Sequence, residues 1–250
     1  MNRKTQRARR NELVFLPHLL TTGNLLCGAA SLLFALEGRY LLAGGCIYLG
    51  MLFDVLDGLT AQRLGLATPF GIEYDSLADF LTFGIAPAFL AYLYAFQALA
   101  DWGWLGSAAL ITATALRLAR FNVQGLEAPR EKSYFQGLPS PASAGVVVGF
   151  LLLFPPRPPL PIVVGLEILT VLAAFLMISR VPFPHLQYIY RRAHFLGQTR
   201  LLFVALVGLL LLLRPRFGLA MLFGGYLLLG IGIYLQHAWG RQRQPPPVDS

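Results

Sequence analysis

The sequence contains a succession of apolar runs that are each long enough to cross a lipid bilayer. A transmembrane helix needs about 20 mostly apolar residues. Hydrophobic residues make up 56% of the chain and charged residues only 13%, whereas about 25% of residues are charged in ordinary soluble domains. The sequence therefore predicts an all-α, polytopic transmembrane helical bundle. The predicted spans lie near residues 18–36, 40–60, 76–99, 103–122, 140–155, 161–179, 200–213 and 217–238.

The basic residues predict the orientation of these spans. With an even number of spans both termini lie on one side, and that side holds 16 of the 20 Lys and Arg residues. Cytoplasmic loops of membrane proteins carry the excess of Lys and Arg. Both termini are therefore expected in the cytoplasm, in a multi-pass protein of the cell membrane. The net charge of +8 then reflects topology and attraction to anionic membrane lipid, and nucleic acid is not expected as a partner. The basic residues on the opposite side are Arg39, Arg157, Arg214 and Arg216.

Four aspartates interrupt the apolar sequence at the junction of the second and third spans. Asp54 and Asp57 stand at positions i and i+3, and Asp75 and Asp79 at i and i+4, so each pair shares one face of a helix. Charges in a membrane segment are costly unless they are paired, and they mark functional sites. Carboxylates suit hard cations such as Mg²⁺ and Mn²⁺, and pairs of such ions are common in phosphoryl transfer. All four aspartates are therefore candidate metal ligands, for two ions.

The residues beside these acids are small. Gly58 and Ala61 leave a groove on the second span in which a ligand such as a nucleotide diphosphate can approach the backbone. A chance gathering of acids at a membrane surface is the alternative interpretation. An EF-hand fits less well, because its alternating D-x-D-x-D-G ligands are absent.

The acidic stretch resembles the CDP-alcohol phosphotransferase family. The family signature is D-x-x-D-G-x-x-A-R, eight residues, then G-x-x-x-D-x-x-x-D. This chain departs from it at one position, where Gln62 replaces the signature Arg and Arg63 follows. The matching positions are Asp54, Asp57, Gly58, Ala61, Gly71, Asp75 and Asp79.

The resemblance implies roles for these residues. Asp54, Asp57 and Asp75 are expected to bind the metal, and Asp79, the last acid of the series, is expected to act as the general base. The Pro-Asn-x-x-Thr-x-x-Asn region of the family lines the nucleotide pocket. Here His18 replaces the first Asn of that region. The expected CDP-binding residues are Thr21, Asn24, Gly58, Ala61, Gln62 and Gly71.

Two further segments are similar to one branch of the family, the membrane-integral phosphatidylserine synthases. They are Arg-Leu-Ala-Arg-Phe-Asn at 117–122 and Gly-Leu-Pro-Ser-Pro-Ala at 137–142. This resemblance implies transfer of a phosphatidyl group from CDP-diacylglycerol to L-serine with release of CMP, and it implies a homodimer. Because a guanidinium can bind a carboxylate in a bidentate way, Arg117 and Arg120 are expected to bind serine, with Asn122 adding a hydrogen bond.

The predicted domain organisation follows the spans. Residues 1–16 form a basic, amphipathic cytoplasmic N-terminus with a short interfacial helix, and residues 17–180 form the six-helix transmembrane core. Residues 181–199 are a cytoplasmic linker, 200–238 hold two additional transmembrane helices, and 239–250 form a disordered tail. The four histidines, His18 among them, show no metal-ligand spacing and are interpreted as structural.

Two alternative functions remain open at this stage. A sister enzyme of the same fold would use glycerol 3-phosphate, an inositol phosphate or choline. An ion-coupled transporter would use the acids as its cation site, although transporter sites lie near the bilayer midplane and these acids gather at one face.

Overall fold

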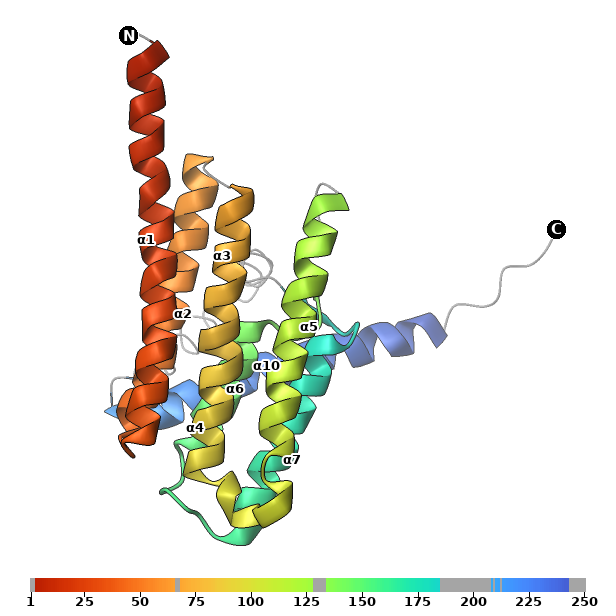
Figure 1. Cartoon of the computed structure of the whole chain (residues 1–250). Helices are drawn as coiled ribbons and strands as arrows, with labels where there is room; N and C mark the ends of the chain where they lie inside the picture. Colours follow the sequence, from red (N-terminus) through yellow and green to blue (C-terminus); the bar gives the residue numbers. More distant parts are fainter. Residues whose placement is uncertain are drawn as a thin grey trace, which may run out of the picture.

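The computed structural model describes residues 3–65, 68–127, 134–184 and 213–242, with residues 208, 210 and 211. Within these residues the chain passes up and down an elongated helical bundle (Figure 1). The passes are formed in order by α1 (Arg3–Leu36), α2 (Tyr40–Leu64), the pair α3 (Pro69–Asp79) and α4 (Ala86–Tyr94), α5 (Leu105–Glu127), α6 (Ser140–Leu151) and α7 (Leu160–Ile178). This arrangement confirms the predicted all-α membrane fold.

Five of the described helices are long and apolar enough to cross a membrane. The fifth pass, α6, is apolar but has only 12 residues. The α5 helix does not meet the same standard of apolarity. It packs against α7, α4 and the segment before α4. Most of the predicted span 200–213 lies outside the described residues. The five helices span Phe15–Leu36, Tyr40–Leu64, Pro69–Tyr94, Leu160–Ile178 and Pro215–Leu235.

The third span contains a π-helical segment, η1 (Phe80–Ile85), between α3 and α4. The Ala86 N–H donates to the Leu81 carbonyl, five residues back. Pro87 follows directly in α4, and its missing N–H removes one backbone hydrogen bond from the continuous helix Pro69–Tyr94. The predicted irregularity at Pro87 is thus a π-segment directly after Asp79, and π-segments are frequent at functional sites. The span also ends earlier than predicted, at Tyr94, because a separate 3-10 helix, η2 (Phe96–Trp102), follows it.

The N-terminal segment differs from the prediction. A short interfacial helix was expected to end before Pro17, but α1 continues through Pro17 without a break. In Figure 1 its first turns extend along the bundle axis, above the other helices. Pro17 has no N–H and so cannot donate a hydrogen bond to the preceding turn of α1. Its carbonyl lies 3.0 Å from the hydroxyl of Thr21, one turn later.

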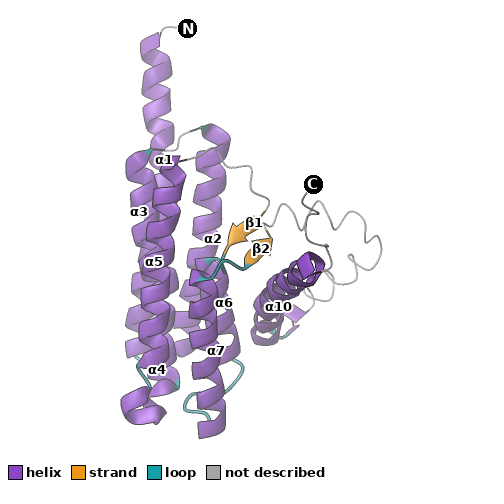
Figure 2. Cartoon of the chain, turned by 90° about the vertical axis from the view of Figure 1, so that its right-hand side faces the viewer, coloured by secondary structure: helices purple, strands orange, loops and turns teal. Residues whose placement is uncertain are grey.

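Two short strands join the start of α6 to the end of α7. β1 (Tyr134–Gln136) pairs antiparallel with β2 (Pro182–Pro184), with Gln136 opposite Pro182. The Gly137 N–H extends the pairing by donating to the Val181 carbonyl at 2.9 Å. Figure 2 shows the strand pair beside the bundle, between the main helices and α10.

The last described helix, α10 (Pro215–Gln242), runs across the bundle instead of along it (Figures 1 and 2). It packs on α6 and on β2. Glycines on α6 make this crossing possible, because the ring of Phe223 fills the space that a side chain at Gly145 would need. Tyr48 of α2 stacks on the same Phe223 ring, with centroids 5.8 Å apart. That α10 crosses the membrane as a separate span stays a prediction.

Candidate functional site

The acidic residues of α2 and α3 converge at one end of the bundle. Asp54, Asp57 and Asp75 each place one carboxylate oxygen so that all three atoms lie within 4.8 Å of one another. The predicted spacing accounts for this convergence, since Asp54 and Asp57 share a face of α2 that meets α3. Asp79 lies one turn beyond Asp75, deeper in the bundle, and is 9% exposed.

Helix α1 supplies a polar partner to one aspartate on each neighbouring helix. The hydroxyl of Thr21 donates to Asp57 Oδ2 at 2.8 Å, and the amide of Asn24 donates to Asp79 Oδ1 at 2.9 Å. Thr21 and Asn24 are themselves buried and stand three residues apart, on one face of α1. The three helices are thus tied together through their polar groups, and the carboxylates are held in fixed positions.

A second layer of contacts supports Asn24. Thr82, which is fully buried in η1, donates its hydroxyl hydrogen to the backbone carbonyl of Asn24 at 2.9 Å. Gly50 on α2 permits this approach, because a Cβ at that position would lie 2.6 Å from Thr82 Cγ2 and 2.9 Å from Asn24 Oδ1. The π-segment therefore helps to set the position of an amide that holds Asp79.

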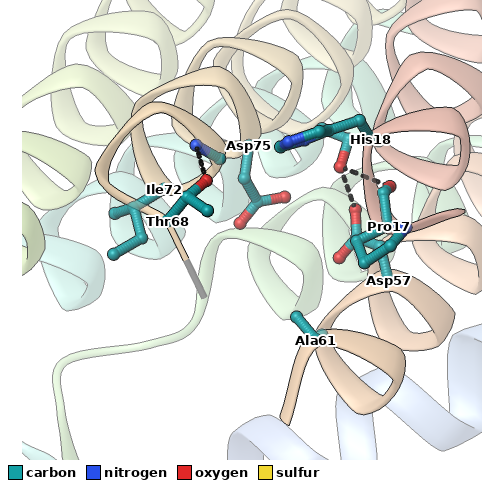
Figure 3. Close-up of a pocket in the computed structure, with 10 residues that line it drawn as sticks. Pro17, His18, Asp57, Ala61, Thr68, Ile72 and Asp75 are labelled. Carbon is teal, nitrogen blue, oxygen red and sulfur yellow. Dashed lines mark hydrogen bonds between the residues drawn. The ribbon is translucent and has the colours of Figure 1, made fainter. Parts of the chain in front are cut away.

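A pocket opens beside the acids, between α1, α2 and α3 (Figure 3). Four of the expected CDP-binding residues line it, namely Thr21, Gly58, Ala61 and Gly71. Asn24 and Gln62 are not among its lining residues; Asn24 is fully buried behind the acids, and Gln62 is exposed. The pocket is lined by Pro17, His18, Thr21, Asp57, Gly58, Ala61, Thr68, Gly71, Ile72 and Asp75.

The sequence analysis missed four of the lining residues, which are His18, Pro17, Thr68 and Ile72. His18 is the one with a side chain that can titrate. It was interpreted as structural, but it stands one turn before Thr21 and points into the pocket region (Figure 3). Its ring packs edge-on against Phe70 and Tyr74, with centroids 5.6 Å and 6.5 Å away. The i, i+3 spacing of His18 and Thr21 was the signal that could have placed it at the site.

The rim of the pocket is formed by the N-terminus of α3. Thr68 caps this helix, because its hydroxyl accepts the Gly71 N–H at 3.0 Å, and Pro69 occupies the first turn. Gly71 packs closely against His18, since a Cβ there would lie 3.0 Å from His18 Cε1. A helix N-terminus favours anions through its free N–H groups and its dipole. The rim of the pocket thus complements a negatively charged group.

The arginines of α5 approach the site from the other side. Arg117 lies near enough to Asp79 to interact with it electrostatically, and it donates to the Gln136 carbonyl of β1 at 3.3 Å. Arg120 donates to the Ile178 carbonyl, at the last turn of α7, at 2.9 Å. Both predicted arginines therefore hold backbone carbonyls. A guanidinium has five N–H donors, so these bonds leave donors for a ligand.

The side chain of Asn122 makes its hydrogen bonds to α3. Its Oδ1 accepts the hydroxyl of Ser76 at 3.1 Å, and its Nδ2 donates to Glu73 Oε2 at 3.2 Å. Both partners lie on α3, so Asn122 links α5 to the helix that carries Asp75 and Asp79. The prediction that Asn122 also contacts a substrate stays a prediction.

The chemistry of the site fits a divalent cation. Its three converging ligands are carboxylates, which are the oxygen donors that Mg²⁺ and Mn²⁺ prefer. Asp75 Oδ1 is buried and, among the described residues, has no hydrogen-bond partner. A buried carboxylate oxygen without a partner is costly, and coordination to a cation would satisfy it.

Comparison with known proteins identifies the family. The model of the CDP-alcohol phosphatidyltransferase family matches residues 14–182. The chain belongs to this family. The match covers the six passes that form the bundle and all of the residues that form the acidic site. CDP-alcohol phosphatidyltransferases are in general divalent-metal-dependent enzymes, and the trio of Asp54, Asp57 and Asp75 is the group that can bind the metal here.

Several relatives of the chain bear the name CDP-diacylglycerol–serine O-phosphatidyltransferase. The protein of Helicobacter pylori strain J99 is 30% identical over 88% of this chain and 91% of its own length. The Bacillus subtilis protein is 34% identical over 68% of this chain and 90% of its own length. A protein from Helicobacter pylori strain 26695 is 35% identical, with 57% of this chain matching 60% of that protein.

Proposed function

We propose that the chain is a CDP-diacylglycerol–serine O-phosphatidyltransferase, which transfers the phosphatidyl group of CDP-diacylglycerol to L-serine and releases CMP. The observation that carries the proposal is the joint arrangement at one end of the bundle. The Asp54, Asp57 and Asp75 oxygens lie within 4.8 Å of one another, a pocket adjoins them, and Arg117 of α5 interacts electrostatically with Asp79. The choice of L-serine as the acceptor alcohol rests on the names of the relatives.

The acids are proposed to hold two Mg²⁺ or Mn²⁺ ions. Asp54, Asp57 and Asp75 are the principal ligands. Asp79, which the sequence analysis predicted as a fourth ligand, lies one turn beyond Asp75 and outside this trio. The bound ions would neutralise the diphosphate of the substrate and the departing CMP. Thr21 keeps Asp57 in place for this role through their 2.8 Å hydrogen bond.

The pocket between α1, α2 and α3 is proposed to hold the CDP group. Gly58, Ala61 and Gly71 lack bulky side chains, so the diphosphate can approach the backbone. The N-terminus of α3, capped by Thr68, faces this group with partial positive charge. Gln62, in place of the signature Arg, offers no cation to the phosphates, and we assign it at most a hydrogen bond to CDP.

Asp79 is proposed to act as the general base. The serine hydroxyl oxygen attacks the phosphorus that bears the diacylglycerol, the bond from that phosphorus to the CMP oxygen breaks, and the hydroxyl proton passes to an Asp79 carboxylate oxygen. The Asn24 amide occupies Asp79 Oδ1, so Oδ2 is the oxygen available for the proton. Positioning and electrostatic stabilisation then supply most of the rate enhancement.

Arg117 and Arg120 are proposed to bind the serine carboxylate. They stand three residues apart on α5 and are held by Gln136 and Ile178. Preorganised guanidinium groups of this kind recognise a carboxylate with two parallel hydrogen bonds. A phosphorylated acceptor would call for more positive charge, and choline for an aromatic cage.

The chain is membrane-integral, and we propose that its active site and both termini face the cytoplasm. Arg63, Arg117 and Arg120 lie at the end of the bundle that holds the acids, whereas Arg39 and Arg157 lie in the connections at the opposite end. The positive-inside rule then places the acidic end in the cytoplasm. The homodimer implied by the resemblance stays a prediction.

The product of the reaction tests the proposal directly. Purified protein in liposomes would be given CDP-diacylglycerol, Mn²⁺ or Mg²⁺ and isotopically labelled L-serine, and the lipids would be analysed by mass spectrometry. Labelled phosphatidylserine is the expected product. Product formed only with glycerol 3-phosphate, an inositol phosphate or choline would assign the chain to a sister enzyme, and ion transport without any CMP release would support the transporter.

A further inference from the structure

The helix α10 lies beyond residue 182, where the match to the family model ends, yet it packs against the part of the fold that holds Arg117. It crosses α6 and continues over β2 (Figure 2). The crossing is close, because Gly145 and Gly149 on α6 leave room for Phe223 and for the backbone of Ala220. This places the middle of α10 against the strand pair.

Phe183 is the contact point between α10 and the strands. It is the central residue of β2 and is fully buried. The ring of Tyr226 lies 5.9 Å from the Phe183 ring, centroid to centroid. Gly230, one turn later on α10, packs directly against the same ring, and a side chain at Gly230 would overlap it. Tyr226 and Gly230 therefore form the surface of α10 that contacts the Phe183 ring.

The strand pair carries this contact to Arg117. Phe183 on β2 is paired with Phe135 on β1, and the neighbouring Gln136 of β1 offers its carbonyl to Arg117 at 3.3 Å. A residue of α10 is thus connected to Arg117 through the strand pair.

We propose that Tyr226 is a positioning residue for Arg117, and that α10 thereby sets the affinity of the enzyme for its acceptor alcohol. Tyr226 holds Phe183 and the strand pair in place, and the strand pair holds the Arg117 guanidinium through the Gln136 carbonyl. The inference rests on the proposed role of Arg117 in acceptor binding. It adds a contribution from outside the family core to acceptor recognition.

The central test is the split between the two substrates in the variant Tyr226→Ala. CMP release would be measured with the acceptor alcohol that supports turnover of the unchanged protein, with each substrate varied in turn. The KM for the acceptor is expected to rise roughly fivefold to tenfold, with the KM for CDP-diacylglycerol unchanged. The variant Tyr226→Phe, which keeps the ring on Phe183, is expected to show a smaller rise.

Two further variants separate positioning from general stability. Tyr234, on the same helix, is 45% exposed, so Tyr234→Ala is a matched control and is expected to leave both KM values unchanged. Gly230→Ala places a methyl group against Phe183 and is expected to raise the acceptor KM as Tyr226→Ala does, without loss of the purified yield.

A double-mutant cycle tests whether Tyr226 acts through Arg117. In an Arg117→Ala background, Tyr226→Ala is expected to have little additional effect on kcat/KM for the acceptor. An undiminished effect in that background, or equal rises in both KM values, would overturn the proposal. These outcomes are distinct from failure of the proposed function, in which the unchanged protein would release CMP with an alcohol other than serine.

Discussion

The substitution Asp79→Asn separates the proposed chemistry from the structure of the site. Asparagine has nearly the same size and shape as aspartate, and its carbonyl oxygen can still accept the Asn24 amide, which now donates to Asp79 Oδ1 at 2.9 Å. The bond that ties α1 to α3 is therefore kept. The carboxylate that would accept the serine proton is lost, and general base catalysis contributes roughly 10² to 10⁴-fold to a rate.

The expected magnitude follows from these numbers. A loss of 10² to 10⁴-fold in kcat corresponds to about 3 to 5 kcal/mol in the activation barrier. Initial rates of CMP release in mixed micelles, together with equilibrium binding of a non-reacting CDP ligand, would measure the two effects separately. Binding is expected to change by less than about threefold. Turnover of Asp79→Asn within about tenfold of the unchanged protein would refute the role of Asp79 as the base.

Three further predictions concern the metal, the acceptor and the membrane topology. Thr21→Val removes the hydroxyl that donates to Asp57 and is expected to weaken Mn²⁺ binding roughly tenfold, measured by electron paramagnetic resonance titration. Arg120→Ala is expected to raise the KM for serine by roughly tenfold or more, with a smaller change in the KM for CDP-diacylglycerol. In intact cells a membrane-impermeant maleimide is expected to label Arg157→Cys and to spare Arg63→Cys, because the acidic end faces the cytoplasm.

Each of these tests has a control within the chain. Thr60→Val removes a hydroxyl that contacts only its own helix among the described residues, at the Leu56 carbonyl, and should leave Mn²⁺ affinity unchanged; an equal loss in both threonine variants would contradict the role of Thr21. A change in the lipid KM alone would reassign Arg120. The labelling is done with Cys27 and Cys46 replaced by alanine. Labelling of Arg63→Cys in intact cells would show that the topology is the opposite of the proposed one.

The acidic site could be predicted from the sequence because its spacing is local. Asp54 and Asp57 had to share a face of one helix, Asp75 and Asp79 a face of the next, and the short connection between the helices had to bring the pairs together. The apolar runs likewise predicted the passes of the bundle, since their length is set by the bilayer.

Features that depend on contacts between distant segments could not be predicted in this way. Asn24 was expected to line the nucleotide pocket, but only the packing of α1 against α3 shows that its amide is used by Asp79. The strand pair β1–β2 joins segments 46 to 50 residues apart, and two of the three residues of β2 are prolines, so neither strand has a recognisable pattern. The crossing of α10 depends on glycines of α6 whose partners are unknown until the helices are placed.

The most direct test of the account is the dependence of CMP release on serine and on a divalent cation. Purified protein would be incubated with CDP-diacylglycerol, with and without L-serine, in Mn²⁺ or Mg²⁺ and then in excess EDTA. The account predicts release of CMP only when serine and the cation are both present, and loss of that release in a variant in which Asp54, Asp57 and Asp75 are all asparagine. Serine-dependent release that persists in EDTA, or in the triple variant, would contradict it.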